Sequence, residues 1–277
     1  MIEKKNIVGV DITNASKNEI LEYIVKSVEN FKKKYFVVTP NPEFLVLANK
    51  NLEFKNILNR ADLASADGIG IIIAAKFLGQ PLKGRFTGVD LVESLCKQVV
   101  RKPITVGFLG GRSGVAEETA ECLQLKYPGL RVVFAASEWP EEPYSNIQAK
   151  VESRRLKVEN KKSFHPLSST VKNPSSTFNP LPSGIDILFV AFGAPKQEFW
   201  ISENLDKIPV KIAIGVGGAF DYISGRVGRA PSWMQNIGVE WLYRLVRQPW
   251  RIWRQLSLLE FIWLVLKEKM SKNRHIA

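Results

Sequence analysis

The stretch ITVGFLGGRSGVAEETAECLQLKYPGLRVVFAA, residues 104–136, contains the pattern that decides the fold class. It predicts a strand at Ile104–Leu109, a glycine loop, a helix at Ser113–Tyr127 and a second strand at Leu130–Ala136. A strand, a helix and another strand of these lengths are typical of parallel strands joined by a crossover helix. This unit therefore predicts part of a parallel sheet.

The same alternation recurs from residue 6 to residue 214. Further strands are predicted at 6–12, 35–39, 62–66, 186–191 and 210–214, and further helices at 16–31, 42–58, 68–78, 88–100 and 195–205. The predicted fold class is α/β, a Rossmann-like sandwich with a mainly parallel sheet, followed by a helical, basic and aromatic C-terminal appendage. The helix at 68–78 is almost wholly apolar, so we expect it to be buried.

Two changes in composition divide the chain. Residues 138–184 are rich in Ser, Pro, Asn and Lys and interrupt the alternation, so we expect a flexible insertion there. After Asp221 the density of Trp and Arg rises. The predicted organisation is a catalytic core at 1–221 and a C-terminal appendage at 222–277.

The net charge is +12, and residues 226–277 contain ten Lys or Arg against three Asp or Glu. An excess of this kind predicts an anionic partner. Arg244, Arg247, Arg251 and Arg254 would share one helical face if Pro249 kinks the helix rather than ending it.

The same appendage carries aromatic side chains and an apolar stretch at Leu256–Leu266, which is shorter than the ~20 residues that a spanning helix needs. We expect it to lie on an anionic membrane surface. An ordinary amphipathic helix packed on the core is the alternative. Basic and aromatic residues also suit single-stranded nucleic acid, but no RNA-binding motif accompanies them, so we expect no nucleic-acid partner.

Three glycine loops follow predicted strands and would lie along one edge of the sheet. Backbone N–H groups in such loops can bind a diphosphate, so we expect a nucleotide cleft there. The spacing around Gly110 and Gly111 is G-x-x-G-G rather than G-x-G-x-x-G, which disfavours NAD. The candidate nucleotide-binding residues are Gly110, Gly111, Gly193, Gly217 and Asp221.

Asp67 follows another strand and precedes the apolar helix. It could cap that helix, or it could be a general base whose pKa is raised by apolar surroundings. Asn41 before Pro42 could likewise be a helix cap, a ligand-binding residue or both, and Arg85 offers a cation at a further helix start.

Several absences narrow the chemistry. Only two histidines occur, His165 and His275, and there is no D-x-D pair, so we expect no metal site and no cofactor. The two cysteines lack metal-type spacing and fit a reduced compartment. The N-terminus lacks the apolar stretch of a secretory signal, so a cytoplasmic location is expected.

Six motifs occur in order along nearly the whole chain outside the insertion. They are TPNPE at 39–43, ADGIG at 66–70, RFTGVD at 85–90, FGAPKQE at 192–198, GVGGAFD at 215–221 and a tail that runs from RAP at 229–231 to EWLYR at 240–244. Together they resemble the WecG/TagA/CpsF glycosyltransferase family. The chain departs from the family pattern at 138–184, where family members have a shorter connection.

The resemblance implies an inverting, metal-independent transfer, typically of N-acetylmannosamine, from a UDP-sugar to the 4-hydroxyl of N-acetylglucosamine on undecaprenyl diphosphate. The product would serve teichoic acid or other surface polysaccharide synthesis, at the inner face of the cell membrane. The implied roles are a general base at Asp67, a catalytic pocket with Arg85 and Gln197, substrate binding by Thr39 and Asn41, and diphosphate contacts from Arg244, Arg251 and Arg254.

Two other function classes stay open at this point. A Rossmann-type oxidoreductase is one, although the glycine spacing counts against it. A basic module that binds RNA or a membrane without catalysis is the other, but it leaves Asp67 unexplained. The exact donor sugar and the oligomeric state are not fixed by the sequence, and a homo-oligomer is compatible with it.

Overall fold

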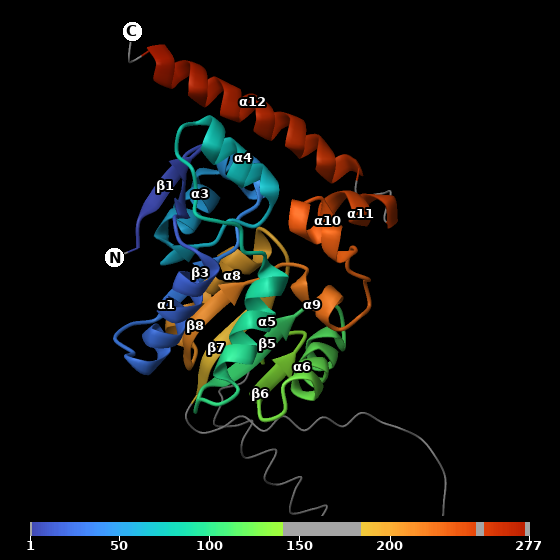
Figure 1. Cartoon of the computed structure of the whole chain (residues 1–277). Helices are drawn as coiled ribbons and strands as arrows, with labels where there is room; N and C mark the ends of the chain where they lie inside the picture. Colours follow the sequence, from blue (N-terminus) through green and yellow to red (C-terminus); the bar gives the residue numbers. More distant parts are fainter. Residues whose placement is uncertain (1, 141–183, 248–251, 275–277) are drawn as a thin grey trace, which may run out of the picture.

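The computed structural model describes residues 2–140, 184–247 and 252–274, so most of the predicted insertion lies outside the described residues (Figure 1). Its main sheet has six strands in the order β4-β3-β8-β7-β5-β6, and every pairing is parallel. The predicted Rossmann-like α/β class is confirmed. The strands are β3 (Tyr35–Val38), β4 (Leu63–Ala64), β5 (Thr105–Gly110), β6 (Arg131–Ala136), β7 (Ile185–Ala191) and β8 (Val210–Gly215).

The predicted strand at 6–12 is wrong, because this segment is a hairpin. β1 (Lys4–Ile7) and β2 (Val10–Thr13) pair antiparallel in a separate two-stranded sheet. Val8 and Gly9 have φ of 51° and 77°, the left-handed geometry of a two-residue hairpin turn. The chain therefore reverses in the middle of the predicted strand.

Helices cover both faces of the main sheet (Figure 1). The predicted helix at 42–58 is two helices, because Asn51 has extended backbone and its side chain accepts a hydrogen bond from the N–H of Phe54 at 3.0 Å. The core helices are α1 (Lys17–Glu29), α2 (Pro42–Lys50), α3 (Leu52–Arg60), α4 (Ile69–Phe77), α5 (Gly88–Val99), α6 (Val115–Lys126) and α8 (Lys196–Asn204).

The strands bury apolar side chains on both faces. In β7, Leu188 and Val190 join one hydrophobic cluster, whereas Ile187 and Phe189 join the other. Successive strand residues point to opposite faces, so a strand that is apolar throughout needs helices on both sides. This explains why β7 is an unbroken apolar run apart from Asp186.

The C-terminal region consists of α9 (Ala219–Ile223), α10 (Ser232–Ile237), α11 (Glu240–Arg247) and α12 (Ile252–Arg274). α12 packs on α2 and α4, and its Phe261 and Leu264 are buried. Figure 1 shows α12 beside α4. None of the helices within the described ranges has the length and hydropathy needed to cross a membrane.

Two expectations for helices need correction. The arginine stripe does not lie on one helix, because Arg244 and Arg247 belong to α11 and Arg254 belongs to α12. Pro249, on which this expectation depended, lies outside the described residues. α4 is buried on one side only: its Ile73 and Phe77 are exposed.

Candidate active site

A cavity of about 1210 Å³ opens at the carboxyl ends of the parallel strands. Five strands supply residues from their ends to its wall: Thr39 after β3, Asp67 after β4, Gly111 after β5, Gly193 after β7 and Gly217 after β8. Ligands of open parallel sheets bind at this edge. The cavity is therefore the candidate active site.

Asp67 is fixed by the backbone of three neighbouring loops. Its N–H donates to the carbonyl of Pro40 at 2.7 Å, and the preceding Ala66 carbonyl accepts from Phe86 N–H at 3.0 Å. Its carboxylate Oδ2 accepts from the N–H of Gly88 at 3.0 Å. Asp67 thus contacts the first turn of α5, and the cap of the following helix α4 is Gly68, without a side-chain hydrogen bond.

Burial raises the pKa of Asp67 from an ordinary 3.8 to about 6. The Gly88 N–H and the Arg85 guanidinium oppose this rise, whereas the carboxylates of Asp90 and Glu240 add to it. A carboxylate with this pKa is ionised at neutral pH and is more basic than an exposed aspartate. This combination is suited to accepting a proton from a bound hydroxyl.

Thr39 and Asn41 line the same cavity and also hold the loop after β3. Thr39 Oγ1 donates to the carbonyl of Gly215 at 2.9 Å, which ties β3 to the end of β8. Asn41 Oδ1 accepts from Phe44 N–H at 3.2 Å and caps α2. Asn41 therefore both caps α2 and lines the cavity wall.

Gln197 joins two glycine loops. Its Oε1 accepts from the N–H groups of Gly193 at 3.2 Å and Gly217 at 3.0 Å, and its Nε2 donates to Glu198 Oε1 at 2.6 Å. The side chain is fully buried, so it fixes the cavity wall formed by the ends of β7 and β8. Burial also raises the pKa of Glu198 to about 8.

α9, which follows the loop after β8, is anchored in the core. Its Phe220 ring is buried with the centroid 5.6 Å from that of Phe108, and the neighbouring Asp221 lines the cavity. Arg244 of α11 lies 3.6 Å from Asp221 Oδ2 and 4.8 Å over the Tyr222 ring. A tail arginine therefore forms part of the cavity wall.

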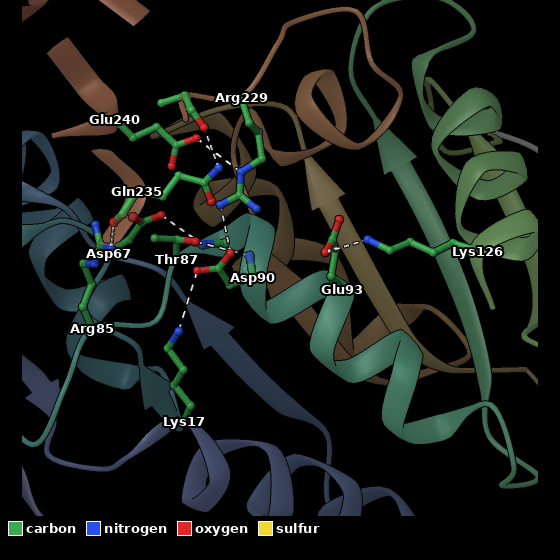
Figure 2. A network of polar contacts seen from close by, with 12 residues as sticks. Lys17, Asp67, Arg85, Thr87, Asp90, Glu93, Lys126, Arg229, Gln235 and Glu240 are labelled. Atoms are coloured by element: carbon green, nitrogen blue, oxygen red, sulfur yellow. Dashed lines mark hydrogen bonds and ion pairs between the residues drawn. The ribbon is translucent and has the colours of Figure 1, made fainter. Parts of the chain in front are cut away.

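A polar cluster joins the tail to the core beside Asp67 (Figure 2). Arg229 lies between Asp90 of α5, at 2.9 Å, and Glu240 of α11, at 3.3 Å. Arg85 donates to the carbonyl of Gln235 in α10. Charges from the tail thus reach the surroundings of Asp67.

Most of the predicted site residues meet at this cavity, and a few do not. Gly110 is absent from the wall, since it lies where β5 and β7 approach closely: a Cβ there would be 2.9 Å from the Ala191 carbonyl carbon. Arg251 and the side chain of Arg254 lie outside the described residues. The predicted residues on the wall are Thr39, Asn41, Asp67, Arg85, Gly111, Gly193, Gln197, Gly217, Asp221 and Arg244.

Sequence reasoning missed two groups of lining residues. Arg112 and Lys196 are exposed cations on the wall. Arg112 directly follows the glycine loop after β5, and Lys196 lies inside the FGAPKQE motif, so their positions beside predicted loops could have identified them. The apolar wall formed by α4 and α12 could not be found, because it joins segments about two hundred residues apart. Across the described ranges, no group of three His, Cys, Asp or Glu side chains could hold a metal ion.

The sequence profile of the glycosyl transferase WecG/TagA/CpsF family matches residues 5–158 and 181–275. The chain belongs to this family of glycosyl transferases. The chain is therefore an enzyme of the transferase class, which decides against the oxidoreductase and the non-enzymatic alternatives.

Curated relatives match this glycosyltransferase over nearly its whole length. The N-acetylglucosaminyldiphosphoundecaprenol N-acetyl-beta-D-mannosaminyltransferase of Bacillus spizizenii is 31% identical over 275 residues, which is 99% of this chain and 95% of the relative. Proteins of the same name from Bacillus subtilis and from Staphylococcus aureus strain MRSA252 are each 28% identical, over 98% and 96% of this chain and 94% and 93% of the relatives.

Proposed function

We propose that this glycosyltransferase moves N-acetylmannosamine, or a related sugar, from a UDP donor to the 4-hydroxyl of N-acetylglucosamine on undecaprenyl diphosphate. The names of the relatives support this acceptor and this sugar, and the similarity extends over nearly the full length of both chains. The product would be a lipid-linked disaccharide for teichoic acid or another surface polysaccharide.

The observation that carries the proposal is the position of Asp67 at the cavity, with its pKa raised to about 6. Its carboxylate takes the proton of the acceptor 4-hydroxyl, and the resulting oxygen attacks C1 of the donor sugar. The bond from C1 to the UDP oxygen breaks and UDP leaves. One displacement of this kind inverts the configuration at C1.

Cations on the cavity wall supply the charge that the departing diphosphate needs, without a metal ion. Arg244 lies beside the loop that follows β8, and Arg112 and Lys196 lie beside the loops that follow β5 and β7. Positive charge placed where negative charge develops lowers the barrier of the transfer step. Gly111, Gly193 and Gly217 leave the backbone of these loops open to the nucleotide.

The enzyme works at the cytoplasmic face of the membrane, where its acceptor is embedded. The tail presents exposed Trp233, Trp241 and Trp263, side chains that favour the membrane interface, together with basic residues that favour anionic lipid. The same tail supplies Arg244 to the cavity. Docking of the tail would therefore bring the acceptor to Asp67.

The test is transfer by purified protein from UDP-N-acetylmannosamine to a short-chain lipid-diphosphate N-acetylglucosamine, read as product mass. Asp67→Asn should lower turnover by roughly 10²–10⁴-fold. Asp206→Asn is the matched control, because Asp206 is exposed and absent from the cavity wall. Turnover by folded Asp67→Asn at the parental rate would exclude Asp67 as the base.

A further inference from the structure

The cavity has two chemically different ends. Near the strand ends it is bordered by Asp67, Arg85 and Arg244, and away from them it continues between α4 and α12, where the wall is apolar. The sugar and diphosphate of a nucleotide donor are polar, so an apolar cleft does not suit them. The second end is therefore expected to bind an apolar ligand group.

Four large apolar side chains line this second end and remain open to water. They are Ile73 and Phe77 of α4, exposed by 61% and 48%, and Ile262 and Leu266 of α12, exposed by 49% and 47%. Apolar surface gathered in a concave site marks a place where an apolar ligand is bound.

The cleft has fixed walls, because α12 is attached firmly to the core. Its Phe261 is buried, Lys50 pairs with Glu260 at 2.6 Å, and Glu268 Oε2 accepts from Val8 N–H at 2.8 Å. α12 runs beside α4 in Figure 1. The two helices thus hold a preformed groove that leads towards Asp67.

We infer that this α4–α12 cleft binds the first isoprene units of the acceptor's polyprenyl chain. The inference rests on the proposed function, which places the sugar diphosphate of the same molecule at the charged end. A lipid-linked sugar diphosphate is polar at one end and apolar at the other, as the cavity is. The cleft aligns the acceptor, so that its sugar hydroxyl reaches Asp67.

The test compares two acceptors, N-acetylglucosamine diphosphates that carry a farnesyl chain or an ethyl group, without vesicles or detergent. The parental enzyme should have a lower KM for the farnesyl acceptor. The double variant Ile73→Ser with Ile262→Ser should raise that KM roughly tenfold, because two apolar contacts are lost, and should change the KM for the ethyl acceptor far less.

Leu259→Ser is the matched control, because Leu259 is an exposed apolar residue of α12 outside the cavity wall. It should leave both KM values unchanged. An equal change of both KM values in the double variant, or no change in either, overturns the inference. A third result would also overturn it. If light scattering shows that the parental protein is a dimer and the double variant a monomer, while the KM for the farnesyl acceptor is unaltered, the cleft binds a second copy of the chain.

If the parental protein transfers sugar to neither acceptor, even after vesicles of anionic lipid are added, the result refutes the proposed function but not the isoprenoid site. Binding of farnesyl diphosphate, measured by calorimetry, then still tests the cleft. The parental protein and Leu259→Ser should bind it roughly tenfold more tightly than the double variant. Equal affinities refute an isoprenoid site.

Discussion

Asp67→Asn should make the protein more stable while removing its activity. The native carboxylate is held among buried groups and near two other carboxylates, Asp90 and Glu240, so its ionised form is disfavoured in the folded chain. Asparagine has nearly the same shape and can still accept the hydrogen bond from Gly88 N–H. The substitution therefore removes an unfavourable charge without creating a cavity.

The size of this effect follows from the pKa. The rise from 3.8 to about 6 corresponds to about 3 kcal/mol, at about 1.4 kcal/mol for each pKa unit. Because Asp67 is partly exposed at the cavity wall, we expect about 1–3 kcal/mol. A native pKa above the unfolded pKa lowers stability as the pH rises from about 4 to about 6, so the full gain appears above pH 6 and none below pH 4.

Urea denaturation of the parental protein and Asp67→Asn at pH 4, 5, 6 and 7.5 measures this difference, with Asp206→Asn as the exposed control. The free energies of unfolding should agree at pH 4 and diverge as the pH rises. A variant that is equally stable, or less stable, at pH 7.5 would refute the stated environment of Asp67. In the parental enzyme, kcat/KM should also fall tenfold for each pH unit below about 6, as the base becomes protonated.

Three further substitutions test the surroundings of the site. Arg229→Met removes the ion pairs with Asp90 and Glu240, so the free energy of unfolding should fall by about 1–2 kcal/mol. Turnover should fall as well. An unchanged urea midpoint would show that Arg229 does not hold the tail on the core. Glu198→Gln should abolish a loss of stability that the parental protein shows as the pH rises from about 4.5 to about 8, since burial raises the pKa of this carboxyl from 4.5 to about 8 in the folded state. Gly88→Ala would place a Cβ 2.9 Å from a backbone carbonyl oxygen, so kcat should fall by roughly tenfold or more, and parental kcat would show that the contact is not needed.

Sequence patterns determined the parallel sheet and most of the candidate site. Strand–helix alternation depends on local spacing of apolar residues, which is readable without a structure. Residues that follow strands, such as Asp67 and Gly217, could be placed at one edge because parallel strands all end there. The hairpin at Val8 and Gly9 was missed, because two left-handed residues inside an apolar run leave the alternation almost unchanged.

Only the tertiary structure decided which distant groups act on each other. The pKa of Asp67 depends on burial and on Glu240, a residue of the tail, and no local pattern encodes this distance. The apolar cleft likewise exists only once α12 packs beside α4. The sequence determined which residues end each strand, because a strand end is set by neighbouring residues. The packing of the tail on the core depends on contacts between segments far apart in the chain. This packing sets the charge and the shape of the site, so only the tertiary structure shows them.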